Sequence, residues 1–449
     1  CWIPCSGISG YHGLELVDTL HWILHYMNMM NSKSQHNIQI PLDIPEVTIK
    51  SVEINEHKDY IISIESRRES AICQHCGKEI TKSHGTGHEI TLRHLSVFGH
   101  RVYIRLRPKR FECPDCGGRT TTQKLSWYEE NSPHTKAYDQ YLILLLINST
   151  VSDVSRKENV GYGAVEGAIE RCVSACVNWE EIEDLAIVGI DEVAMKKGKN
   201  NYLAIISSQQ ADGRIVLLGV LEDRKKERVR DFWESIPENL RKTMAVVCTD
   251  MWKGYVNATE EFSKKHKLSL EVVIDRYHVA KNYREAVDKL RKKETRRLKE
   301  ELSEEEYEEI KGAMWIIRKN EADLEDEEKE KLNRFFEYSP DLKLAYTFRE
   351  NLTNIFEMNL TKEEGKEKLL DWKDNVEQSA LSCFDKFLTT LDNWLDKIAN
   401  YFTARLSSGF VEGLNNKLKT TKRRCYGILR TRTLFQRLYL DLEGYRYFA

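Results

Sequence analysis

The period at which apolar residues recur changes along the chain, and the first regular segment has the two-residue period of β-strands. Residues 47–66 alternate between apolar and polar, and the polar stretch 55–59 supplies a turn. This pattern predicts a β-hairpin. Residues 101–107, RVYIRLR, alternate again. The sequence therefore predicts a small β domain, which we place at residues 46–126.

From residue 134 to about 179 the apolar positions recur at helical spacing instead. Within this segment, Val151–Lys157 and Val165–Cys172 predict two short helices, and a turn at 159–161 joins them. This is the geometry of a helix-turn-helix, although two short helices are also a common packing unit. We place a helix-turn-helix DNA-binding domain at residues 127–180.

The period then changes to that of strands with helices between them. The order of these elements predicts an α/β domain, which we place at residues 181–445. From about residue 279 to 401 the pattern is helical and highly charged, and we place an all-α insertion at about 285–400. The predicted strands of the α/β domain are 185–190, 201–208, 214–221, 245–249 and 270–274.

Composition narrows the class of protein. A chain of 449 residues with 41% hydrophobic residues can bury more than one core, which indicates several domains. Its 68 basic and 71 acidic residues nearly balance, so affinity for a polyanion must come from local clusters. No apolar run approaches the roughly 20 residues of a membrane helix, and the start lacks the features of a signal peptide. We expect a cytoplasmic protein without a membrane partner.

The start of the chain is unusual, because it begins with Cys1 and its first methionine is Met27. We interpret residues 1–45 as an N-terminal extension, and leave open whether the chain begins at the native start.

Two C-x-x-C pairs are the strongest local motif. Cys73 and Cys76 form the first knuckle, Cys113 and Cys116 form the second, and glycine follows each. Four thiolates can close a tetrahedral zinc site; the alternative is unligated surface cysteines. A four-cysteine site leaves no open position for a substrate water, so we expect structural Zn²⁺ that stabilises a zinc ribbon.

The spacer between the knuckles contains the basic strand 101–107, with three arginines on one face, Arg101, Arg105 and Arg107. We expect the zinc ribbon to present this face to DNA phosphates.

Acidic residues follow two of the apolar runs in the α/β segment. Asp191 follows LAIVGI and Asp250 follows AVVCT. Because α/β folds bind ligands at the carboxyl ends of strands, both are candidate metal ligands. Either one alone is weak evidence, since an aspartate at a strand end is often a cap or turn former. Asp275 also ends a strand and competes for this role, but we prefer a structural or supporting role for it.

A third acid, Glu412, lies in SSGFVEGLNNKLKTTKRR. Helical spacing puts it on one face with Lys419 and Arg423, and puts Leu414 and Leu418 on the opposite face. The candidate DNA contacts in this segment are Lys417, Lys419, Lys422, Arg423 and Arg424.

Phosphodiester cleavage by two metal ions needs such a cluster. Carboxylates are the hard oxygen ligands that hold Mg²⁺ (or Mn²⁺), and neighbouring cations can hold the phosphates. The sequence therefore predicts a metal site formed by Asp191, Asp250 and Glu412.

The order of these motifs resembles the ISL3 family of bacterial insertion-sequence transposases. The shared motifs are the paired knuckles, the helix-turn-helix, GIDEVAMKKGKNNY, CTDMWKGY, IDRYHVAKN and SGFVEGLNNKLKTTKRRCYG. The resemblance implies a ribonuclease H-like core with the all-α block as an insertion. It also implies a DDE catalytic triad at Asp191, Asp250 and Glu412, which would bind Mg²⁺. The zinc ribbon and the helix-turn-helix would bind the terminal inverted repeats of the element.

We therefore expect a multidomain α/β DNA transposase that binds element ends, cleaves them with two metal ions and joins the 3′ hydroxyl to target DNA. We expect it to act as a homo-oligomer on double-stranded DNA. Two alternatives remain: a catalytically silent DNA-binding regulator derived from a transposase, and a metal-dependent nuclease.

Overall fold

A computed structural model describes residues 41–194, 202–404, 409–425 and 430–449. Nearly all of the predicted N-terminal extension lies outside the described residues. The chain divides into two compact units. Of the described residues, the first contains 41–50, Ile64–Gly87 and Pro108–Gln123, and the second contains Ser51–Ser63, His88–Arg107 and those from Lys124 onward.

The first unit is a small β structure around the cysteines. Phe111 and Ile80 are buried beside Cys73 and Cys113, so the knuckles share a small core with apolar side chains. A two-stranded sheet and a three-stranded sheet form this unit, with β3 (Ala71–Ile72) and β4 (Glu79–Ile80) in one and β5 (Lys82–Thr86), β8 (Lys109–Cys113) and β9 (Arg119–Thr122) in the other. A 3₁₀ helix, η1 (Pro114–Cys116), carries the second knuckle.

A separate four-stranded sheet contains the predicted hairpin and the basic strand. Its order is β1 (Val47–Ile54), β2 (Tyr60–Ser66), β7 (His100–Leu106) and β6 (Ile90–Val97). The basic strand therefore belongs to a different sheet from those that carry the knuckles. The physical reason is that β7 has an apolar face, made of three side chains that are each at most 2% exposed, Val102, Ile104 and Leu106. That face requires a sheet and a core of its own.

The predicted helix-turn-helix is confirmed. Asn159 has a positive φ of 52° and ends the first helix of the motif, and the second helix starts after Gly161. The three helices of this region are α2 (Lys136–Leu146), α3 (Val151–Glu158) and α4 (Tyr162–Cys172), and they share a core with Leu440 from the last helix, α17 (Thr431–Phe448).

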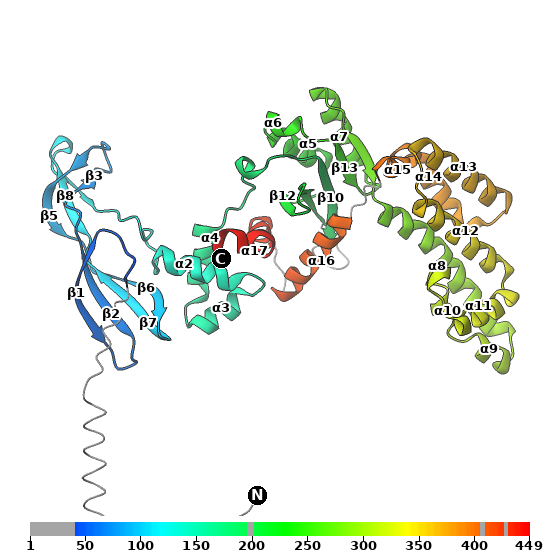
Figure 1. Cartoon of the computed structure of the whole chain (residues 1–449), viewed down its shortest axis with the longest axis horizontal. Coiled ribbons are helices and arrows are strands. Elements are labelled where there is room, and N and C mark those ends of the chain that lie inside the picture. Colours follow the sequence, from blue (N-terminus) through cyan, green and yellow to red (C-terminus); the bar gives the residue numbers. More distant parts are fainter. Residues whose placement is uncertain (1–40, 195–201, 405–408, 426–429) are drawn as a thin grey trace, which may run out of the picture. The chain divides into compact units, whose positions relative to one another are not determined.

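The second unit also contains a five-stranded mixed sheet (Figure 1). β11 pairs antiparallel with both β12 and β10, whereas β13 pairs parallel with β10 and β14. This arrangement is consistent with the ribonuclease H-like core. The strands, in sheet order, are β12 (Ile215–Leu221), β11 (Tyr202–Gln209), β10 (Ile187–Ala194), β13 (Val246–Thr249) and β14 (Glu271–Ile274).

Helices cover both faces of this sheet, because successive side chains of a strand point to opposite faces. On β11, Ala204 and Ile206 pack with Trp233 of α5 and Phe262 of α7. The alternate residues pack on the other face with α16 and α17. The helices involved are α5 (Lys226–Ser235), α6 (Glu238–Arg241), α7 (Lys253–His266), α16 (Gly409–Arg424) and α17.

The predicted all-α block follows β14 and ends before α16 (Figure 1). Its core is continuous with the sheet, because Val272 and Ile274 share a cluster with its apolar side chains. Its helices are α8 (Arg276–Glu301), α9 (Glu304–Ile310), α10 (Ala313–Ile316), α11 (Asp326–Tyr338), α12 (Pro340–Glu357), α13 (Lys362–Gln378), α14 (Asp385–Ala399) and α15 (Tyr401–Ala404). Among the helices of the described ranges, none is long and apolar enough to cross a membrane.

Candidate active site and zinc centre

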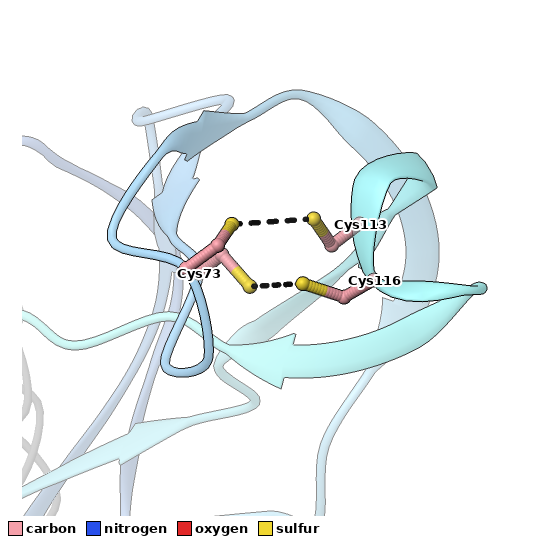
Figure 2. Close-up of side chains that lie close together, drawn as sticks. Cys73, Cys113 and Cys116 are labelled. Carbon is pink, nitrogen blue, oxygen red and sulfur yellow. Dashed lines mark hydrogen bonds between the residues drawn. The ribbon is translucent and has the colours of Figure 1, made fainter.

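The four knuckle sulfurs lie at the corners of a small cluster, as Figure 2 shows for the labelled cysteines. Sγ of Cys73 lies 3.9 Å from Sγ of Cys116, and Sγ of Cys76 lies 3.7 Å from Sγ of Cys113. All four sulfurs fall within 4.8 Å of one another. Tetrahedral zinc with Zn–S bonds of about 2.3 Å requires sulfurs roughly 3.8 Å apart. The geometry therefore fits a four-thiolate zinc site.

Local backbone geometry forms each knuckle. Gly77 and Gly117 have φ of 73° and 66°, a region that glycine occupies without strain, so each loop can turn back after its second cysteine. Backbone N–H groups of His75 and Cys76 lower the pKa of the Cys73 thiol to about 6, whereas contacts with the neighbouring thiols raise the pKa of Cys116 to about 12. Four ionised thiolates at this spacing need a bound cation to offset their repulsion.

Strand register places three aspartates in one row at the carboxyl edge of the parallel strands. Ile190 of β10 is paired with Thr249 of β13, and Thr249 is paired with Ile274 of β14. The next residue on each strand is an aspartate, Asp191, Asp250 or Asp275. We call these three residues the carboxylate row.

Asp191 lies inside β10 and not after it, which differs from the predicted end of the strand at residue 190. β10 continues to Ala194 because it keeps its antiparallel pairing with β11, in which Asp191 is opposite Ile205. Its parallel pairing with β13 ends at Ile190. Asp191 thus lies at the carboxyl edge relative to β13, although not at the end of its own strand.

Asp250 has an unusual environment for a carboxylate. Burial raises its pKa, nearby Glu192 and Asp191 raise it further, and the result is about 6. Tyr255 is buried beside the same carboxylates, and its hydroxyl makes no hydrogen bond within the described part of the chain. The site therefore concentrates negative charge in a desolvated position, which favours a cation there.

Asp275 caps the helix that follows its strand. Its carboxylate accepts a hydrogen bond of 2.8 Å from the backbone N–H of Tyr277 and so caps α8. The same cap brings His278 to the carboxylate row. Its Nε2 atom lies 3.7 Å from Oδ1 of Asp191 and 3.9 Å from Oδ2 of Asp275.

The sequence reasoning did not single out His278. The available signal was its spacing of three residues after Asp275, which places it in the first turn of the helix that Asp275 caps.

Glu192 and Arg224 form a second feature that we did not predict. Nη1 of Arg224 lies 2.9 Å from a carboxylate oxygen of Glu192. The guanidinium also stacks 4.0 Å from the ring centroid of Trp252 and 4.7 Å from that of Tyr202. A positioned cation thus lies beside the row, and its aromatic contacts restrict its motion.

The predicted third acid, Glu412, lies in α16, which contacts β10. The apolar face predicted for this helix is confirmed, because Leu414 and Leu418 pack with Val193 of β10 and with β11 and β12. The side chain of Glu412 lies outside the described residues, so its carboxylate is not placed relative to Asp191 and Asp250.

The basic residues of α16 have different surroundings. Lys419 and Arg423 are exposed, whereas Lys417 donates to Asn148 and Lys422 donates to the carbonyl of Ala194. Arg424 forms an ion pair with Asp441, whose side chain is fully buried. The guanidinium of Arg424 is therefore held by an internal carboxylate, unlike the exposed Lys419 and Arg423.

Arg101 and Arg105 lie on the face of β7 opposite its buried residues, as predicted, and Arg107 directly follows the strand. Glu89 pairs with Arg105 at 3.5 Å and with Arg107 at 3.3 Å, which offsets part of their charge. Arg107 is exposed, and Arg101 is partly buried.

The fold and these sites define a class of protein. A mixed sheet with acids at the carboxyl edge of its parallel strands, together with a four-cysteine cluster and a helix-turn-helix, is the organisation of a DNA-processing enzyme with a ribonuclease H-like core and its own DNA-binding domains.

Comparison with known proteins identifies the family. Residues 188–438, more than half of the chain, match the ISL3-family transposase model, named DDE_Tnp_ISL3. Residues 69–127 match the zinc-finger of transposases IS204/IS1001/IS1096/IS1165, and residues 123–173 match the helix-turn-helix domain of transposase family ISL3. The chain belongs to the ISL3 family and is a DNA transposase with a structural zinc site.

Two similar proteins are named as transposases of insertion sequence elements. The chain is 27% identical over 360 residues to the transposase for insertion sequence element IS1001 of Bordetella parapertussis, covering 79% of this chain and 85% of that protein. It is 23% identical over 418 residues to the transposase for insertion sequence element IS1557 of Mycobacterium tuberculosis, covering 85% and 88%.

Proposed function

We propose that Asp191, Asp250 and Glu412 are the catalytic residues of this transposase and that they bind Mg²⁺ during DNA cleavage and joining. The observation that carries this proposal is the strand register that sets Asp191 next to Asp250, where burial and mutual repulsion raise the pKa of Asp250 to about 6. Glu412 enters through the family resemblance and through its place on α16, which packs beside β10.

The donor set fits Mg²⁺. Carboxylate oxygens are its preferred protein ligands. The buried Tyr255 hydroxyl beside them lacks a protein partner in the described ranges, so the site has a polar group left to satisfy when it is filled. When two divalent ions are bound, they supply an activated nucleophile and stabilise the leaving oxygen. The protein's own residues would orient the ions and exclude water, while Arg224 and His278 hold the surrounding carboxylates in place.

We propose that the zinc ribbon and the helix-turn-helix bind the terminal inverted repeats and that the 3′ hydroxyl released by cleavage attacks target DNA. The exposed cations Arg107, Lys419 and Arg423 would contact phosphates. The further candidates are Arg101, Arg105, Lys417, Lys422 and Arg424. Pairing two ends requires at least two protomers on DNA, and the reaction would take place in the bacterial cytoplasm.

The test compares the wild type with Asp191→Asn, Asp250→Asn and Glu412→Gln on DNA that carries the ends of the element. We expect nicked and joined products from the wild type with Mg²⁺ and none from these variants. Asp392→Asn is a matched control, because Asp392 pairs with Lys373 in the all-α block. Nicks without joined products would support a nuclease, and end binding without any product from the wild type would support a DNA-binding regulator.

A further inference from the structure

One face of α8 lines a cavity of about 370 Å³ in the all-α block. Tyr277, Lys281, Arg284 and Arg291 contribute from α8, and Arg318 contributes from the segment after α10. The α8 residues are spaced by four, three and seven positions, so they form one stripe along the helix. The volume falls within the range of about 300–1,000 Å³ that is typical of ligand sites, which is enough for a nucleotide-sized group.

The cavity favours an anionic ligand. Two carboxylates line it, Glu285 and Asp288. Asp288 is already neutralised, since Arg291 lies 2.8 Å and Arg318 lies 3.1 Å from its Oδ1. Glu285 is exposed, and its single negative charge is outnumbered by the positive charges of Lys281 and Arg284. Although burial alone would raise the pKa of Asp288, contacts with Lys292, Arg291 and Arg318 lower it to about 2. Lys281 and Arg284 are exposed at the same face, and Arg284 donates to the uncharged amide oxygen of Asn320. Their charge remains available to phosphates.

Exposed aromatic rings lie among these cations. Tyr277 is 51% exposed and Trp315 is 61% exposed, and the guanidinium of Arg318 lies 4.8 Å from the Trp315 ring centroid. Aromatic rings interleaved with cations bind single-stranded nucleic acid, because unpaired bases stack on the rings while the cations follow the phosphates. Bases within a duplex are already stacked and cannot use these rings.

The cavity begins beside the carboxylate row. The ring of Tyr277 contacts that of His278 in an edge-to-face arrangement with centroids 5.5 Å apart. Nε2 of His278 lies 3.7 Å from Asp191. A strand leaving the carboxylate row can therefore reach Tyr277 first and then Lys281 and Arg284, which follow at one and two helical turns.

We propose that this face of α8 binds unpaired nucleotides of the DNA strand next to the cleaved bond, with a base stacked on Tyr277 and phosphates held by Lys281 and Arg284. The proposal rests on the active site proposed at Asp191 and Asp250. Enzymes that act within a duplex commonly remove nucleotides from the stack, at a cost of a few kcal/mol. Stacking on Tyr277 would offset part of that cost.

The test measures binding of the full-length chain, without divalent metal, to two labelled DNA ends of equal sequence. One end is fully paired, and the other has unpaired nucleotides at the cleavage junction. We expect Tyr277→Ala to weaken binding to the unpaired end by about 5- to 100-fold, the usual effect of removing one stacking ring, while binding to the paired end is unchanged. The double variant Lys281→Ala, Arg284→Ala should also weaken binding to the unpaired end and leave binding to the paired end unchanged.

Matched variants separate this role from a fold defect. Tyr277→Phe keeps the ring and should keep the preference for the unpaired end. Lys293→Ala removes an exposed cation of α8 outside the cavity and should change neither affinity. An equal loss on both DNAs, or no loss with Tyr277→Ala, would overturn the proposal.

Measuring both cleavage and binding by Asp191→Asn separates a failure of this proposal from a failure of the proposed active site. If both proposals hold, this variant keeps its preference for the unpaired end and loses cleavage. Cleavage by Asp191→Asn would reject the active-site assignment, whereas the binding data would still decide the role of Tyr277.

Discussion

His278 and Asp191 meet at the carboxyl edge of the sheet, with Nε2 of the imidazole 3.7 Å from Oδ1 of the carboxylate. Asp191 belongs to β10, whereas His278 belongs to the first turn of α8 at the start of the all-α block. The contact therefore joins the block to the carboxylate row, so the block helps to position the acids.

Replacing His278 with alanine should reduce cleavage without preventing DNA binding. Residues that orient metal ligands typically change activity by about 10- to 100-fold when they are removed. We expect a loss of this size in the rate of Mg²⁺-dependent nicking, with unchanged affinity for the paired end. His266→Ala is the control, since His266 pairs with Glu234 away from the row. Wild-type nicking rates in His278→Ala would argue against a positioning role.

Zinc should be bound stoichiometrically by the four cysteines. Elemental analysis of the purified chain should find one Zn²⁺ per chain, because the described residues contain one such cluster. Cys113→Ser should lose the metal and unfold the first unit, since a four-thiolate site supplies much of the stability of so small a core. Cys176→Ser changes an exposed cysteine outside the cluster and should keep the metal. Retention of full zinc by Cys113→Ser would contradict this assignment.

Asp441 should be important for stability. Its buried carboxylate pairs with Arg424 and accepts hydrogen bonds of 2.9 Å from Thr421 and from the backbone N–H of Asn148. Asp441→Ala would leave these groups without their partner and should cost roughly 3 kcal/mol in the free energy of unfolding.

Chemical denaturation measures the change in the free energy of unfolding caused by Asp441→Ala, and Glu170→Ala is the variant for comparison. Glu170 forms an exposed pair with Arg432, so its loss should cost less than about 1 kcal/mol. Equal effects of the two substitutions would show that Asp441 does not join α16 to the helix-turn-helix in solution.

Asp139 should make the helix-turn-helix sensitive to acid. Although burial would raise the pKa of Asp139, hydrogen bonds from His134 and Arg171 lower it below its ordinary value. The folded state therefore prefers the ionised form, and this contribution is complete above the unfolded pKa of about 3.9. It is lost as pH falls through the lower pKa of the folded state.

The experiment compares the unfolding of the wild type with that of Asp139→Asn as a function of pH. The variant should be less stable at neutral pH, and the difference should narrow below about pH 4 as Asp139 becomes protonated in the wild type. A difference that stays constant with pH would exclude this linkage.

The sequence by itself determined the features that depend on short-range pattern and on ligand chemistry. Two C-x-x-C pairs predicted the zinc site, helical spacing predicted the buried face of α16 at Leu414 and Leu418, and the turn at 159–161 predicted the helix-turn-helix. These features can be predicted from the sequence because the period of apolar residues, the turn residues and the type of metal ligand are local properties of the chain.

Tertiary structure decided which distant residues meet. Strand register aligned Asp191 with Asp250, a capped helix brought His278 to them, and Arg424 paired with the buried Asp441. The basic strand joined a sheet other than that of the zinc knuckles. Spacing along the chain places His278 in the first turn of its helix, but it does not fix these contacts. Each contact depends on burying an apolar face or a charge against a partner that only the packed fold supplies.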